Sequence, residues 1–347
     1  MAGLLLEQGH EVIGVHMKLH DAAPGTIPGH CCGLDDALDA RRVADTLGIP
    51  FYVMNLRNAF QKAVMDNLAD TYLRGATPNP CIQCNGVLKF KVLLARAKAL
   101  GASHLATGHY ARITDGNNGP QLRTAVDDAK DQTYFLFPVT AEALGQTMFP
   151  LGGLSKPEVR EIASRMGLIT ASKAESQEIC FIPDDDHGRF ISDYRPEVDG
   201  SGDIVDETGA VLGRHDGYFK YTIGQRRGLG VALGRPAYVL RVEADTRRVV
   251  ITTGVSLLDH IGLRAGSANW YDRPDPDEVV EVRIRHRGRR VPCRIGAGDV
   301  FEVDFLEPER AVAPGQAAVF YSGDRVLGGA WIRRAIAANP TPMQVSA

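Results

Sequence analysis

The sequence predicts an α/β region that is followed by β-rich regions. Two observations support this fold class. Over the first 110 residues, short apolar runs typical of buried strands alternate with amphipathic helical stretches. After about Gly200, short alternating runs are separated by Gly, Pro and Asp turn residues, which is enough for one or two small barrels or sandwiches. A chain of 347 residues is long enough for two or three domains, each with its own core.

Strand and helix patterns alternate regularly in the first region. In order, they predict a buried strand over 11–19, a helix over 34–48, a strand over 50–56, a helix over 87–101 and a strand over 102–110. Both helices end at a glycine, which readily adopts the left-handed backbone of a helix C-terminus. This alternation predicts a parallel sheet with helices on both faces, whose ligands bind at the carboxyl ends of the strands. The motifs "HMK" (16–18) and "TGHY" (107–110) fall at such ends.

A further helix is predicted over 155–168, because Ser155 is a good N-cap and Pro157 lies in the first turn. Pro, Gly and Asp cluster near 194–202 and 263–276, where domain boundaries are expected. The predicted domains are an α/β domain over 1–195, a small β-rich domain over 200–263 and a further β-rich domain over 264–340, which the resemblance described below identifies as a nucleotide-binding and catalytic domain, a central domain and a β-barrel.

The composition is that of an ordinary globular protein, with 44% apolar and 23% charged residues and a net charge of −3. This charge argues against a protein that coats nucleic acid over its whole surface, while a local basic face remains compatible with it. No apolar run reaches the length of a membrane span, and the start "MAGLLLEQGHEV" does not resemble a signal peptide. We therefore expect a cytoplasmic protein with no membrane partner and with reduced thiols.

The stretch "TPNPCIQCNGVLKF" (77–90) places Cys81 and Cys84 three residues apart. A structural zinc site needs four ligands, and the adjacent Cys31 and Cys32 are poorly spaced to complete one. A redox couple is expected at a helix start after the first strand, which this pair does not follow. Inert packing residues are a further alternative, although the "TPNP" turn favours an exposed loop tip. Cys180, in "SQEICFIP", is predicted to begin a short apolar strand and is either a packing residue or a third converging thiol.

Three polar motifs are candidates for binding. "AKDQTYF" (129–135) is typical of a solvated loop, and "YTIGQRRGLG" (221–230) is a candidate phosphate-contacting turn. "VRIRHRGRRVPCR" (282–294) holds six arginines and no acid. On a strand, Arg283, Arg285, Arg287 and Arg289 would share one face. Such a face is either simply solvated or contacts a phosphate backbone, and the lack of acidic partners nearby in the sequence favours the second interpretation.

Six motifs in this order resemble the tRNA-specific 2-thiouridylases: "TPNPCIQCNGVLKF", "HLATGHYARI", "KDQTYFLF", "SQEICFI", "GQRRGLG" and "APGQAAVFYSGDRVLGGAWI". The resemblance spans about residues 3 to 333. It implies an N-terminal adenine-nucleotide hydrolase-like α/β domain, a small central domain and a C-terminal β-barrel that helps hold tRNA. It also implies an enzyme that uses ATP and Mg²⁺ to adenylate C2 of the wobble uridine in the anticodon loop, then installs sulfur from a cysteine persulfide supplied by a sulfur-donor protein.

The resemblance also assigns roles residue by residue. It implies that Cys84 is the first catalytic thiol and that Cys180 carries the persulfide. Other matches are nucleotide-contacting positions at Met17 and Gly108, a loop that meets the target base at Asn79, Pro80 and Cys81, and tRNA contacts at Lys130, Asp131, Gln132, Arg285 and His286. A base unstacks from an RNA loop more cheaply than from a duplex, so an anticodon loop suits this chemistry. Whether Cys84 and Cys180 pair in a disulfide is left open.

One departure from the family pattern concerns Cys81, where many members have aspartate. With Cys84 and Cys180, it makes three thiols that could hold a [4Fe-4S] cluster with one open iron. The cluster and the plain persulfide route are both retained as alternatives.

The second departure concerns the glycine-rich "SGGxDS" loop that cradles the ATP phosphates in the family. The present sequence starts with the segment that follows this loop. Our expectation is that Met1 is a misassigned start and that the chain as written binds ATP poorly. The alternative function is a catalytically inactive tRNA-binding remnant.

Overall fold

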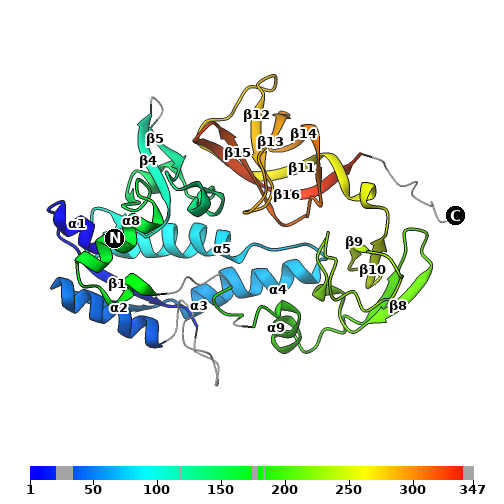
Figure 1. Ribbon diagram of the computed structural model, residues 1–347, viewed down its shortest axis with the longest axis horizontal. Coiled ribbons are helices and arrows are strands. Elements are labelled where there is room, and N and C mark those ends of the chain that lie inside the picture. Colours follow the sequence, from blue (N-terminus) through cyan, green and yellow to red (C-terminus); the bar gives the residue numbers. More distant parts are fainter. Residues whose placement is uncertain (21–33, 117–118, 174–178, 183, 339–347) are drawn as a thin grey trace. The chain divides into compact units, whose positions relative to one another are not determined.

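The computed structural model describes residues 1–20, 34–116, 119–173, 179–182 and 184–338. The chain forms two compact units. The first contains residues 1–66, 80–186 and 323–326, and the second contains residues 67–79, 187–322 and the chain from Leu327 onward (Figure 1). Cys31 and Cys32 lie outside the described residues, so the zinc alternative that involved them is not tested.

The first unit begins with the predicted α/β alternation. Its elements are α1 (Ala2–Glu7), β1 (Gly14–Lys18), α2 (Leu34–Leu47) and β2 (Phe51–Asn55). β1 and β2 pair in parallel, with Gly14 opposite Phe51 and Lys18 opposite Asn55. A second parallel pair joins β3 (Leu105–Ala106) to β6 (Thr147–Met148). The predicted strands over 11–19 and 50–56 and the helix over 34–48 are therefore confirmed.

Two helical stretches of the first half contain π-helical turns. The first comprises α3 (Arg57–Phe60), η1 (Gln61–Met65) and α4 (Asp66–Leu73). The second comprises α5 (Pro80–Gln83), η2 (Cys84–Leu93) and α6 (Leu94–Ala99). η2 is a π-helix of ten residues. Most π-helices are single-turn bulges and occur often at functional sites, so this stretch is unusual in its length.

The remainder of the first unit contains a hairpin and short helices. The hairpin is formed by β4 (Ala111–Gly116) and β5 (Gly119–Thr124). The helical elements are η3 (Asp128–Lys130), η4 (Thr133–Phe135), α7 (Ala141–Leu144), α8 (Lys156–Arg165) and η5 (Ile169–Ser172). Ser155 caps α8 as predicted. Its backbone N–H and its hydroxyl both donate to Glu158, at 2.7 and 2.6 Å.

The second unit contains α9 (His187–Tyr194) and a four-stranded sheet of order β8-β7-β10-β9. These strands are β7 (Gly202–Val205), β8 (Val211–His215), β9 (Tyr238–Glu243) and β10 (Arg248–Thr252). Two short 3-10 helices, η6 (Tyr218–Lys220) and η7 (Val255–Leu258), connect its segments.

A closed barrel of order β11-β14-β13-β12-β15-β16 follows, and pairing between β11 and β16 closes it (Figure 1). Its strands are β11 (Asp259–Trp270), β12 (Val280–Arg283), β13 (Val291–Ile295), β14 (Val300–Arg310), β15 (Ala317–Ser322) and β16 (Arg325–Ala337). Apolar side chains fill it, among them Cys293, which is fully buried. Burial raises the pKa of Cys293 to about 12, so this thiol is a packing residue. The predicted α/β-plus-β fold class is confirmed. Among the described residues, no helix is long and apolar enough to cross a membrane.

Candidate active site

The "TPNP" loop is held from one side by the "APGQ" motif of the barrel. The backbone N–H of Thr77 donates to the carbonyl of Pro314 at 2.8 Å. The side-chain amide of Gln316 donates to the carbonyls of Thr77 at 3.3 Å and Pro78 at 2.9 Å. These bonds fix the backbone that leads into Asn79, the last residue before the first unit resumes at Pro80. Two motifs far apart in the sequence thus form one loop anchor.

Cys84 and Cys180 are brought together. Both thiols are half-buried, and both pack against one apolar cluster whose buried members are Leu19, Leu56, Phe60, Val64 and Leu88. The pKa of Cys84 is raised to about 11, mainly by burial; Lys89 opposes this shift, and the nearby Cys180 and Cys81 contribute to it. Cys180 lies in a turn, so the predicted strand beginning at this residue is wrong. The predicted convergence of the thiols has a structural basis.

Cys81 differs from the other two thiols because it is exposed, on the short helix α5. Its exposure agrees with the expected accessibility, but it lies on a helix rather than at a loop tip. Among the side chains that the structure describes, no group of three His, Cys, Asp or Glu is arranged to hold a metal ion. The iron–sulfur cluster alternative stays a prediction.

The two candidate nucleotide-contacting residues both lie near carboxyl ends of parallel strands. Met17 is the penultimate residue of β1 and packs against the cluster that holds Cys84 and Cys180. Gly108 follows β3, and a Cβ added there would meet only Leu151 Cδ1, at 3.7 Å. The protein itself therefore leaves room for a side chain at 108, and the surface there is open to close approach by a ligand. Both positions are compatible with a nucleotide at the strand ends.

The segment 130–132 is less exposed than the predicted solvated loop. Asp131 is only 4% exposed, and its carboxylate accepts from the N–H of Ala125 at 3.2 Å and the hydroxyl of Thr133 at 2.8 Å. The side-chain oxygen of Gln132 accepts from the N–H of Tyr110 at 2.9 Å. Lys130 ends η3 and is half-buried. The interpretation as a solvated loop is therefore wrong for Asp131, whose carboxylate stabilises this segment internally.

Sequence reasoning missed the residues that dock η2. Asn85 is 3% exposed, and its side-chain amide donates to the carbonyl of Phe135 at 3.1 Å. A Cβ on Gly86 would meet the ring of Pro138 at 3.1 Å, so glycine permits this close approach. These contacts hold the start of η2, called the thiol helix because it begins at Cys84, against the "KDQTYFLF" segment. In the sequence these residues appear as the "CNG" triplet, which by itself does not indicate contacts with Phe135 and Pro138.

The arginine-rich segment is a turn rather than a strand. β12 ends at Arg283 and β13 begins at Val291, so the expectation of four arginines on one strand face is wrong. Acidic partners also come from β14. Arg285 pairs with the buried Glu309, and Arg289 pairs with Glu309 and Glu307 at 2.8 Å each.

His286, next to Arg285, lies in the same turn and is half-buried. Arg287 is exposed and has no ion pair within the part of the chain that the structure describes. Of the arginines in this turn, Arg287 is thus the one whose charge is unneutralised by a neighbouring acid.

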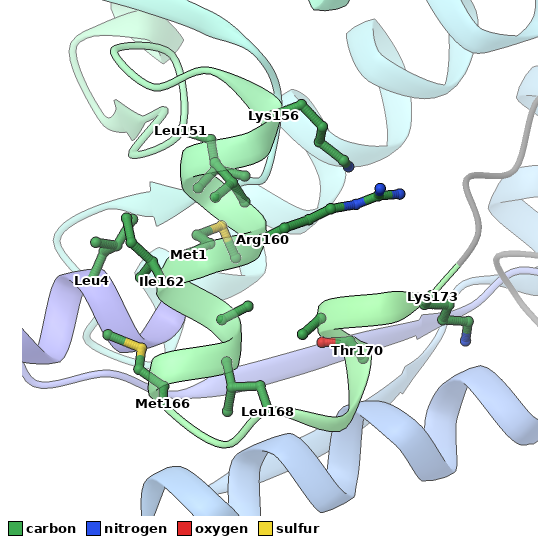
Figure 2. Close-up of a pocket in the computed structure, with 13 residues that line it drawn as sticks. Met1, Leu4, Leu151, Lys156, Arg160, Ile162, Met166, Leu168, Thr170 and Lys173 are labelled. Carbon is green, nitrogen blue, oxygen red and sulfur yellow. The ribbon is translucent and has the colours of Figure 1, made fainter.

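A separate cavity of about 150 Å³ lies in the first unit between α1 and α8, with Met1, Leu4 and Met166 among its lining residues (Figure 2). Three basic residues, Lys156, Arg160 and Lys173, also line it, and Lys173 is paired with Asp36 and Asp39. No residue assigned a role above lines this cavity. The chemistry of the thiols lies elsewhere.

Comparisons with known proteins agree with this architecture. A family model described as the tRNA methyl transferase HUP domain matches residues 1–184. Models for the PRC-barrel domain of the same group and for an aminomethyltransferase β-barrel domain match residues 188–253 and 260–332. The chain is therefore a three-domain protein of the nucleotide-binding HUP class with two β-barrel domains.

Curated relatives define the family more closely. The tRNA-specific 2-thiouridylase MnmA of Geobacter metallireducens is 49% identical over 344 residues, covering 96% of this chain and 93% of the relative. The proteins of the same name from Geotalea uraniireducens and Rickettsia typhi are 50% and 46% identical, covering 96% and 97% of this chain and 92% and 95% of the relatives. The chain belongs to the tRNA-specific 2-thiouridylase family, which makes it a tRNA-uridine sulfurtransferase.

Proposed function

We propose that this protein converts the wobble uridine of a tRNA anticodon loop to 2-thiouridine, with sulfur carried on Cys180 and released by Cys84. The observation that carries this proposal is the packing of Cys84 and Cys180 against one apolar cluster. Bound ATP with Mg²⁺ would supply the adenylyl group that makes the C2 oxygen of uridine a good leaving group. Met17 and Gly108, near the ends of β1 and β3, would contact the nucleotide.

The sulfur step follows from the chemistry of two neighbouring thiols. A sulfur-donor protein would load Cys180 as a persulfide, Cys180–S–SH. The thiolate of Cys84 attacks Sγ of Cys180, the bond between Sγ and the terminal sulfur breaks, and hydrosulfide leaves with the electron pair. A Cys84–Cys180 disulfide forms, and an external dithiol supplies two electrons to reopen it. Hydrosulfide then attacks C2 of the adenylated uridine, the bond between C2 and its oxygen breaks, and AMP leaves with that oxygen.

The apolar cluster gives this step a suitable environment. Its side chains exclude water from the flank of both thiols, which limits loss of sulfide to the solvent. Exposed Cys81, with Asn79 and Pro80, would meet the target base, and Lys130, Asp131, Gln132, Arg285 and His286 belong to the two segments proposed to contact tRNA. For Asp131, the contact would be made by the backbone of this segment and not by the buried carboxylate. We propose a cytoplasmic location, because the proposed substrate is a tRNA.

The test combines purified protein, an unmodified tRNA transcript, Mg²⁺-ATP and sodium polysulfide. We expect 2-thiouridine in the nucleoside digest, measured by mass spectrometry, together with AMP, at a high concentration of ATP because the chain as written is expected to bind ATP poorly. The Cys180→Ser variant should form no 2-thiouridine while binding tRNA normally, and Cys293→Ala, which changes a thiol in the barrel core, should retain activity. Normal tRNA binding without AMP or 2-thiouridine in the parent protein would overturn the proposal and favour a tRNA-binding protein without catalysis.

A further inference from the structure

The buried position of Cys84 creates a chemical difficulty. Thiol–disulfide chemistry requires the thiolate, and a pKa of about 11 leaves roughly one Cys84 in ten thousand ionised at pH 7. This value already includes the opposing effect of Lys89 and the smaller raising effects of Cys180 and Cys81, so the ionised fraction would be lower still without Lys89. A nucleophile in this environment needs a nearby positive charge.

Lys89 supplies a positive charge on the same helix. It lies five residues after Cys84 within η2, and π-helical hydrogen bonds join residues five apart, so the two residues are about one turn from each other. Its charge lowers the pKa of Cys84, against the effect of burial. An ordinary α-helix would place its fifth residue farther around the axis, so the π-helical geometry matters to this pairing.

His109 holds the end of Lys89. The ammonium Nζ lies 3.5 Å from Nε2 of His109, and Nδ1 of His109 lies 2.8 Å from the hydroxyl of Thr107. Burial and the charge of Lys89 keep the pKa of His109 well below its usual value, so the ring is neutral. Because an ammonium only donates, Nε2 is the acceptor, and Nδ1–H donates to Thr107.

The imidazole is itself well fixed. It is 8% exposed, and its centroid lies 5.9 Å from the rings of both Phe90 and Phe149. The backbone N–H of Thr107 donates to the carbonyl of Met148 at 3.1 Å, extending the pairing of β3 and β6. The "TGHY" motif therefore contributes His109, which holds Lys89 of the thiol helix, in addition to Gly108.

We propose that Lys89, oriented by His109, is the positioning residue that stabilises the thiolate of Cys84. This inference rests on the proposed function for its purpose, since Cys84 is there the nucleophile that releases sulfur. The proton of Cys84 leaves to solvent, and Lys89 keeps its own protons throughout. The role of Lys89 is electrostatic, so a side chain that keeps the charge should preserve it and a neutral one should not.

The test measures alkylation of Cys84 by iodoacetamide from pH 6 to pH 10, with peptide mass mapping to separate Cys84 from Cys81 and Cys180. This reaction requires neither tRNA nor ATP, so its outcome is independent of whether the protein thiolates uridine. Lys89→Gln keeps a donor toward His109 and removes the charge. Lys89→Arg keeps the charge, and Lys91→Gln is a matched control, because Lys91 is exposed on the same helix.

For Lys89→Gln we expect the alkylation profile of Cys84 to shift to higher pH, with a rate at pH 8 that is about tenfold lower, since an adjacent opposite charge shifts a pKa by about one unit or more. Lys89→Arg should restore most of the rate, and Lys91→Gln should match the parent protein. If Lys89 only supported the fold, Lys89→Gln would change the melting temperature and leave the pH profile of Cys84 alkylation unchanged. Superimposable profiles for the parent and Lys89→Gln would overturn the proposal.

Discussion

Cys84 and Cys180 pack against the same buried apolar cluster, although one begins a helix and the other lies in a turn much later in the chain. This relationship links the fold to the proposed chemistry. The cluster is built from β1, the residue after β2, α3, η1 and η2, so the parallel strands and the thiol helix share one core. Changes that disturb this core should therefore affect both stability and sulfur transfer.

Asp131 should matter for stability more than for contact with tRNA. Its buried carboxylate satisfies the backbone N–H of Ala125 and the hydroxyl of Thr133. Asp131→Ala leaves these donors unsatisfied and should lower the free energy of unfolding by roughly 2 kcal/mol. Chemical denaturation measures this loss. Filter binding of tRNA well below the melting temperature should give the parent affinity, and a large loss of affinity in the fully folded variant would instead indicate direct contact.

His109 should make stability depend on pH. Its pKa is lowered well below the value in an unfolded chain, so the unfolded state binds more protons below about pH 6.5. The contribution of the neutral ring to the free energy of unfolding is complete above that pH. Below it, the free energy of unfolding decreases by about 1.4 kcal/mol per pH unit. Urea titrations between pH 7 and pH 5 should show this slope, and His109→Gln should reduce it. An equal slope in His109→Gln would mean that other groups cause the dependence.

The two arginines at the barrel turn should behave differently. Arg287 has no acidic partner among the described residues, whereas Arg285 is paired with buried Glu309. Arg287→Ala should weaken tRNA binding and reduce its salt slope by about one phosphate contact, with unchanged stability. Arg285→Ala should weaken binding and also destabilise the barrel, because Glu309 loses a partner. Salt-dependent filter binding and thermal melting measure the two effects, and an unchanged salt slope for both variants would place this turn away from tRNA.

Local sequence signals predicted many of the helices and strands. Ser155 and Glu158 form the expected helix start, and β1 and β2 fall within the predicted apolar runs. These elements depend on residues that are close in the chain, which is why pattern alone finds them. The family resemblance added the roles of Cys84 and Cys180, which no local pattern provides.

The features that the sequence did not reveal depend on contacts between distant segments. The arginine turn was predicted as an unpaired strand because its acids, Glu307 and Glu309, lie on β14. The burial of Asp131 follows from its contact with Ala125, and the pairing of Lys89 with His109 joins η2 to the segment after β3. Spacing along one chain gives no sign of such partners.

The most direct test of the account follows the two thiols through one turnover. Cys180 is loaded as a persulfide with sodium polysulfide, excess reagent is removed, and tRNA with Mg²⁺-ATP is added before nonreducing peptide mapping. The account predicts a Cys84–Cys180 disulfide in step with 2-thiouridine, and a retained Cys180 persulfide in Cys84→Ser. Formation of 2-thiouridine while both residues remain free thiols, or at the full rate in Cys84→Ser, would contradict it.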